Sequence, residues 1–90
     1  MKMFPIEVGS VVHSLAGRDQ CRLFVVIQEV DSDFVMLADG KLRTMDHLKK
    51  KRRKHLKTTG IVIEELRSRL ANGEAVENHE VRSWLKREEK

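Results

Sequence analysis

A run of six positive side chains gives this chain its clearest binding chemistry. Residues 49–54 read Lys-Lys-Lys-Arg-Arg-Lys, and the wider stretch 41–57 carries nine Lys or Arg against a single Asp. The whole chain has a net charge of +4, so its positive balance lies entirely within this short stretch. Because like charges repel one another, the run predicts binding to a polyanion, of which nucleic acid is the usual example. A solvated linker between folded parts is the alternative interpretation.

The types of basic residue indicate how a phosphate backbone would be held. Lysine supplies a point charge, whereas an arginine guanidinium can place two hydrogen bonds on phosphate oxygens or stack on a base. Neutralising phosphates releases condensed counterions, and this release is the source of the affinity. The residues expected to contact phosphate are Lys49, Lys50, Lys51, Arg52, Arg53, Lys54 and Lys57, with His55 as a further candidate.

Groups that could catalyse a reaction or bind a metal are scattered along the chain. His13, His47, His55 and His79 are far apart, and Cys21 is the only cysteine. Zinc sites need closely spaced Cys and His pairs, and a nucleophilic thiol needs a base beside it. A Cys21 nucleophile activated by a distant histidine is therefore the disfavoured alternative to a structural thiol. We expect no metal, no cofactor, no small-molecule substrate and no enzymatic activity.

Length and composition predict one compact domain, with room for an appendage, in a chain of 90 residues. A single cysteine excludes an internal disulfide and favours a reducing, cytoplasmic location. No apolar stretch approaches the roughly 20 residues that are needed to cross a bilayer. The first six residues are too short and too interrupted for a signal segment. We therefore expect no membrane partner.

The elements that must position the basic run begin with short β-strands. The clearest is 22–30, where β-branched residues are abundant and successive side chains alternate between two faces. Asp39-Gly40 is a strong hairpin signal after a third, almost wholly apolar strand. The expected strands are 7–13, 22–30, 34–38 and 42–45, with 54–58 as a fifth that closes a small barrel.

After residue 58 the apolar period changes to that of a helix. Thr58 or Thr59 is the expected N-cap, with Val62, Ile63, Leu66 and Leu70 forming an apolar stripe.

Asn72-Gly73 is the expected end of that first helix. A second short helix is expected from about His79, with Asn78 as its N-cap and an apolar face of Val81, Trp84 and Leu85. Helices this short are marginal alone, so both are expected to pack on the barrel or on each other.

The loop and strand 17–26 resemble the KOW motif of ribosomal proteins and transcription elongation factors, and the preceding 8–12 fits the strand that leads into it. The hairpin 38–43 and the later Lys54-His55-Leu56 resemble a particular branch of this family. That branch consists of small bacterial KOW-domain proteins similar to a KOW-type large-subunit ribosomal protein of archaea and eukaryotes. The resemblance covers roughly residues 7–58; the family usually has glycine where this chain has Cys21.

This resemblance implies a mainly β fold with an α tail, in which an SH3-like five-stranded barrel precedes one or two short C-terminal helices. The barrel would span residues 1–58 and end in the basic segment, and the helical extension would span 59–90. The family binds structured RNA, often ribosomal RNA, through its first loop and basic edges. The resemblance therefore adds Arg18, Gln20, Arg22, Lys41 and Arg43 to the expected RNA contacts.

The aromatic side chains are Phe4, Phe24, Phe34 and Trp84, with no tyrosine. Proteins that read splayed-out bases rely on exposed aromatic platforms. Phe24 and Phe34 fall in apolar strands and are expected in the core, and Trp84 is expected to pack the second helix on the barrel. The composition therefore favours recognition of the backbone and shape of a folded RNA.

Taken together, the sequence predicts a non-enzymatic protein that grips structured RNA, with ribosomal RNA as the expected class and ribosomal proteins as further partners. The main alternative is a protein-interaction module that docks on a ribosomal or transcription-complex protein, with an acidic surface facing the basic run. Non-specific binding of DNA is a third interpretation.

Overall fold

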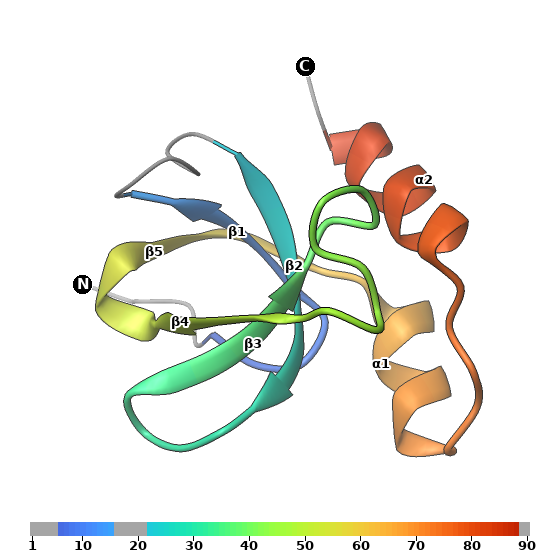
Figure 1. Ribbon diagram of the computed structural model, residues 1–90, viewed down its shortest axis with the longest axis horizontal. Helices are drawn as coiled ribbons and strands as arrows, with labels where there is room; N and C mark the ends of the chain where they lie inside the picture. The colour runs from blue at the N-terminus through green and yellow to red at the C-terminus, as the bar shows by residue number, and fades with distance from the viewer. Residues whose placement is uncertain (1–5, 16–21, 89–90) are drawn as a thin grey trace.

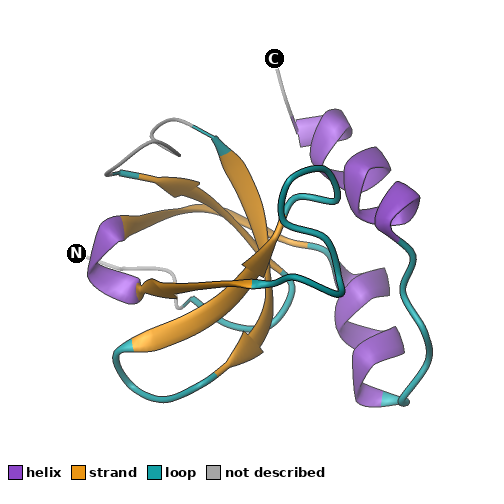
Figure 2. Ribbon diagram, in the orientation of Figure 1, coloured by secondary structure: helices purple, strands orange, loops and turns teal. Residues whose placement is uncertain are grey.

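The computed structural model describes residues 6–15 and 22–88, and it is mainly β. Five antiparallel strands form one sheet in the order β4-β3-β2-β1-β5, and two C-terminal helices lie beside it (Figures 1 and 2). The strands are β1 (Ser10–Ser14), β2 (Leu23–Glu29), β3 (Phe34–Ala38), β4 (Lys49–Arg52) and β5 (Leu56–Val62). The helices are α1 (Glu64–Ala71) and α2 (Asn78–Glu88).

The sheet must curl, because its two edge strands are consecutive in the chain. Only the 3-10 turn η2 (Arg53–His55) separates β4 from β5. A flat sheet would hold these edges about 19 Å apart, at roughly 4.8 Å per strand spacing. Four residue steps reach at most about 14 Å even when fully extended. The edges therefore approach each other at this end, although no pairing of β4 with β5 closes the sheet within the described residues.

Curling gives the sheet two apolar faces, each with its own core. The inner core contains Val12, Phe24, Val26, Val35, Leu37 and Leu56, which come from β1, β2, β3 and β5. The outer core joins Val11, Val25, Ile27 and Ala38 of the sheet to Ile63, Leu66, Val81, Trp84 and Leu85 around the two helices. Burial on both sides explains why the middle of β2 is a continuous apolar run.

The fourth strand differs from the sequence expectation. Residues 42–45 were the predicted returning strand, but they form a loop, and the basic run itself pairs with β3 as β4. The Asp39 carboxylate explains the loop, because its Oδ1 accepts the backbone N–H groups of Lys41 and Arg43, each at 2.9 Å. These bonds turn the chain away from a tight hairpin, and strand pairing resumes at Lys49.

The start of the first helix also differs. Thr58 and Thr59 were the predicted N-caps, but both belong to β5, and Thr59 Oγ1 donates a hydrogen bond to Val11 O at 2.9 Å. Pairing with β1 extends the last strand beyond the predicted 54–58, as suits β-branched threonine. Lys54 and His55 lie in η2, so β5 begins only at Leu56.

The predicted end of the first helix is confirmed, whereas the predicted N-cap of the second is wrong. The predicted stop at Asn72-Gly73 is confirmed: Asn72 is the C-cap of α1, and Gly73 has a left-handed φ of 73°. The predicted second helix is confirmed as α2, but Asn78 does not cap it. Asn78 Oδ1 accepts the Met45 N–H at 2.7 Å instead, and Glu80 Oε1 accepts the Glu77 N–H at the helix start.

Candidate nucleic-acid interface

The side chains of β4 alternate between the two faces of the sheet. Lys50 and Arg52 are exposed, whereas Lys49 and Lys51 are half-buried. In register, Arg52 lies opposite Phe34 and Lys50 opposite Met36, and partners in an antiparallel pair share a face. The period of two therefore divides the side chains of β4, and Lys50 and Arg52 form the exposed face of this strand.

An aromatic ring lies beneath both exposed cations. Lys50 Nζ is 4.7 Å and Arg52 Cζ 5.0 Å from the centroid of the Phe34 ring. Both distances are within the range of a cation–π contact, which limits where the two charged groups lie. Phe34, which the sequence assigned to the core, is half-buried on the outer face. We call Lys50, Arg52 and Phe34 the β4 face.

The other two lysines of β4 are on the side of the inner core. Lys49 pairs with Leu37 and Lys51 with Val35, and both apolar partners belong to that core. Partial burial lowers the pKa of the Lys49 ammonium, and the neighbouring charge of Lys51 lowers it further. The hydrocarbon stems of lysines at such positions can cover apolar surface while the charged ends reach water.

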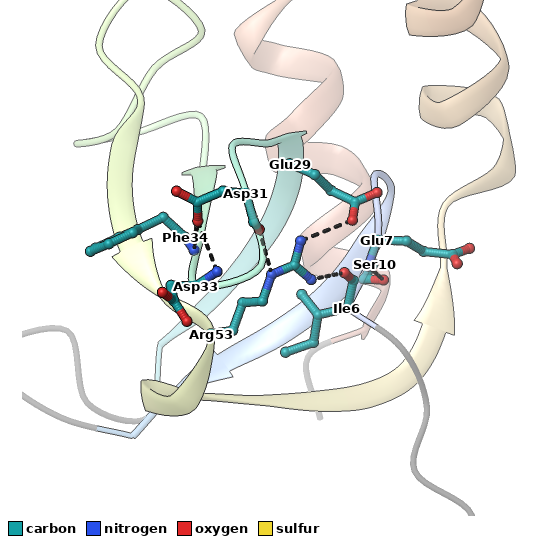
Figure 3. A network of polar contacts seen from close by, with 8 residues as sticks. All are labelled: Ile6, Glu7, Ser10, Glu29, Asp31, Asp33, Phe34 and Arg53. Atoms are coloured by element: carbon teal, nitrogen blue, oxygen red, sulfur yellow. Dashed lines mark hydrogen bonds and ion pairs between the residues drawn. The ribbon is translucent and has the colours of Figure 1, made fainter.

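The Arg53 guanidinium forms hydrogen bonds with oxygen atoms of its own chain (Figure 3). Nη1 donates to Ile6 O at 2.6 Å, Nε to Asp31 O at 3.1 Å and Nη2 to Glu29 Oε1 at 2.9 Å. Its side chain is only 24% exposed. We call this set the Arg53 clamp, because it ties η2 to the β2–β3 turn and to the chain before β1.

Asp31, one of the three acceptors in the clamp, also shapes the β2–β3 turn. Asp31 Oδ1 accepts the N–H groups of Asp33 and Phe34, each at 2.8 Å (Figure 3). These bonds, the one from Asp33 first, lower the pKa of the Asp31 carboxyl, and the charges of Lys50 and Arg53 add to the effect. The turn that positions Phe34 is thus held by an ionised carboxylate.

The remaining predicted contact residues, Lys54, His55 and Lys57, lie in η2 and at the start of β5. Lys54 and Lys57 are exposed and His55 is half-buried. The His55 carbonyl accepts the Leu15 N–H at 2.8 Å, and Lys57 lies opposite His13 in the β1–β5 pair. Positive charge therefore continues from β4 around the turn to the start of β5.

The second group of predicted contacts is separate from β4. Arg22 is 40% exposed, and its Nη2 lies 3.8 Å from Asp39 Oδ2. Lys41 and Arg43 belong to the loop that Asp39 organises. Arg18 and Gln20 lie outside the described residues. The sequence did not assign Arg82 or Lys86 of α2 to binding, although their spacing of four residues placed them on one helix face.

No group of three His, Cys, Asp or Glu side chains in residues 6–15 and 22–88 is arranged to hold a metal ion. None of the described helices has the length and apolar character to span a membrane.

No family model matches this chain, and a search of curated proteins found no significant relative. The geometry of the basic residues is therefore the basis for assigning a function.

Proposed function

We propose that this chain is a non-enzymatic RNA-binding protein that grips a structured RNA, with ribosomal RNA as the class, by its phosphate backbone. In this proposal the curled sheet is an SH3-like barrel of the KOW type. The observation that carries the proposal is the β4 face, where two cations lie exposed over one aromatic ring at the sheet edge. Lys54 and Lys57 extend the same charge around η2.

Phosphate binding is supported by the placement of the two cations, whose charged groups lie 4.7 and 5.0 Å from the centroid of one ring. A side chain limited by a contact with Phe34 loses less freedom on binding than a fully mobile one. Lys50 and Arg52 can thus meet phosphates at low entropic cost.

Recognition of backbone and shape is supported over reading of unstacked bases. Of the aromatic residues in 6–15 and 22–88, Phe24 and Trp84 are buried, and the outer side of Phe34 lies under Lys50 and Arg52. Base-reading modules need an aromatic face open to the base. A folded RNA instead presents phosphates and 2′-hydroxyls along its helices, which cationic side chains can contact without unstacking.

The edge position of β4 supports one second candidate, a protein-interaction module. An edge strand can receive an added strand from a partner, and an acidic segment would match the lysines here. Lysine on an edge strand also discourages such pairing, which makes RNA the better-supported partner. The experiment below separates the two.

The test compares Lys50→Gln/Arg52→Gln with Arg67→Gln/Arg87→Gln, which removes the same charge from exposed positions on α1 and α2. Binding is measured to a synthetic RNA hairpin across a salt series. If about five phosphates are contacted, the wild-type log–log salt slope is roughly −3.5 to −4.5. Losing two contacts should weaken binding roughly 25- to 60-fold at about 0.1 M salt and reduce the slope by about 1.4 to 1.8.

The control double variant should bind within roughly threefold of wild type, because its charges lie away from the β4 face and are screened by salt. Circular dichroism and urea unfolding verify that both variants fold. Equal losses in the two variants, or no salt-dependent affinity in the wild type, would overturn the proposal. Duplex DNA competing as well as the RNA hairpin would replace folded RNA with non-specific nucleic acid as the ligand.

A further inference from the structure

A groove between α2 and the loop after β3 holds a second set of basic side chains. Its volume is about 1080 Å³, and its charged lining comes from three parts of the chain. Arg22 precedes β2, Lys41 belongs to the loop, and Arg82 and Lys86 belong to α2. Asp39 and Glu88 are the acidic lining residues, and two histidines complete the polar walls.

The basic side chains of this groove differ in whether they already have polar partners within the protein. Arg82 Nη1 donates to Gly40 O at 2.6 Å, and Arg22 lies beside Asp39. Lys41 and Lys86 are exposed, and neither has an ion-pair partner within residues 6–15 and 22–88. They are the lining residues best placed to meet an external anion.

The two walls are held in a fixed relation at Gly40. Its φ of +78° is left-handed, and a Cβ there would lie 2.6 Å from Asn78 O and 2.8 Å from Arg82 Cγ. The backbone of the loop therefore packs directly on the first turns of α2. The Met45 N–H bond to Asn78 Oδ1 adds a second tie between the same two segments.

The α2 wall of the groove is also held in place by its packing on the sheet. Val81, Trp84 and Leu85 are buried in the outer core against Val25 and Ala38. With these residues buried, α2 cannot turn without exposing apolar surface, so Lys86 stays on the groove wall. A groove with fixed walls binds without the cost of ordering a loop.

We infer that this groove is a second phosphate-backbone contact for the same folded RNA, with Lys41 and Lys86 as its phosphate ligands and α2 as an RNA-binding element. This inference rests on the proposed function for the class of ligand. Small-molecule sites are mostly apolar and enclosing. Here six of the eleven lining residues are charged and four of those six are basic, as suits an extended anionic backbone.

The test is the pair Lys86→Glu and Arg87→Glu, adjacent exposed residues in the last turn of α2. Both reversals change the net charge equally and carry the same helix-dipole cost, but only Lys86 lines the groove. Lys86→Glu should weaken binding to the synthetic RNA hairpin by at least roughly five- to eightfold at about 0.1 M salt. It should also reduce the salt slope by about 1.

Arg87→Glu should bind within roughly twofold of wild type, and Lys41→Glu should reproduce the loss from the opposite wall. If Lys86→Glu and Arg87→Glu behave alike while the β4 double variant loses affinity, the groove inference is overturned and the proposed function stands. If wild type has no salt-dependent RNA affinity, the proposed function fails first.

An NMR titration of the unmodified protein with the same hairpin gives a readout that does not depend on mutation. Amide shifts are expected in 39–43 and 82–86 together with β4. Shifts limited to β4 would overturn the inference.

Discussion

In β4, Lys50 and Arg52 lie exposed over the ring of Phe34, whereas the next residue, Arg53, donates three hydrogen bonds to oxygens of its own chain. The two regions are neighbours in one run of like charges. The β4 face leaves its cations exposed to solvent, and the Arg53 clamp uses its cation to join segments that are distant in sequence.

This difference shows that a run of basic residues in the sequence does not place all of its charges on the protein surface. The two-residue period of the strand sends Lys49 and Lys51 to the inner side. The 3-10 turn then swings Arg53 toward the β2–β3 turn. Two of the first five basic residues are left on the exposed face, and substitutions can separate these roles.

The largest expected effect separates stability from binding. Arg53→Gln should lower the free energy of unfolding by about 1.5–3 kcal/mol, because it removes charge-assisted bonds from a half-buried site. Arg52→Gln, one residue away, should lower it by at most about 1 kcal/mol, because it loses only an exposed cation–π contact. Urea unfolding measures both.

The same pair should give the opposite order in RNA affinity. Arg52→Gln is expected to weaken binding roughly five- to eightfold at about 0.1 M salt, and folded Arg53→Gln to stay within roughly twofold. Equal unfolding free energies for the two variants would remove the distinction between clamp and face.

The next prediction tests whether the Arg53 clamp stabilises the fold through its charge alone or through the geometry of its three hydrogen bonds. Arg53→Lys keeps the charge but cannot reach three acceptors in different directions, so unfolding should become easier by about 1 kcal/mol. Arg52→Lys serves as the control, with little change expected in urea unfolding or RNA affinity. A wild-type midpoint for Arg53→Lys would show that a positive charge alone holds η2.

A smaller effect on RNA affinity is expected from removing the Phe34 ring of the β4 face. Without the ring, the side chains of Lys50 and Arg52 must be ordered on binding at a cost of about 0.5–1 kcal/mol, so Phe34→Leu should weaken RNA binding roughly two- to fivefold. Phe34→Tyr keeps the ring and should retain wild-type affinity in the same titration. Unchanged binding in Phe34→Leu would mean that Lys50 and Arg52 act without the ring.

The smallest expected effect concerns acid stability of the turn that joins the two regions. The folded-state pKa of Asp31 is lowered by the N–H groups of Asp33 and Phe34. Its stabilisation is therefore present above the unfolded value of about 4 and is lost as pH falls through the lower folded pKa. Asp31→Asn keeps an Oδ1 acceptor but cannot titrate, so urea midpoints should depend less on pH below about 4.

Asp33→Asn, in the same turn, is the control for the Asp31 variant. If Asp31→Asn loses stability on acidification as steeply as wild type, other carboxylates control the acid response of this protein.

Much of the fold could be predicted from local patterns. The β2 and β3 strands follow from short apolar runs bounded by turn residues, and α2 follows from its apolar stripe. Gly73 ends α1 because only a residue tolerant of positive φ fits there. These features depend on neighbours a few residues apart, which the sequence displays directly.

The fourth strand could not be predicted in the same way. Lysine-rich segments have low strand propensity, and Asp39-Gly40 is a strong local signal for a returning strand at 42–45. The Asp39 carboxylate and the packing of Gly40 against α2 overrode that signal. Pairing with β3 then made the basic run a strand.

By itself, the sequence determined that positive charge is concentrated in one short stretch, that short strands precede two helices, and that residue types suited to metal or nucleophilic sites are not grouped. Only the tertiary structure decided which cations face solvent. Arg53 meets a carbonyl 47 residues away, and Lys41 and Lys86 line one groove only because α2 packs on the loop. Such contacts depend on how distant segments meet, which no local pattern of residues specifies.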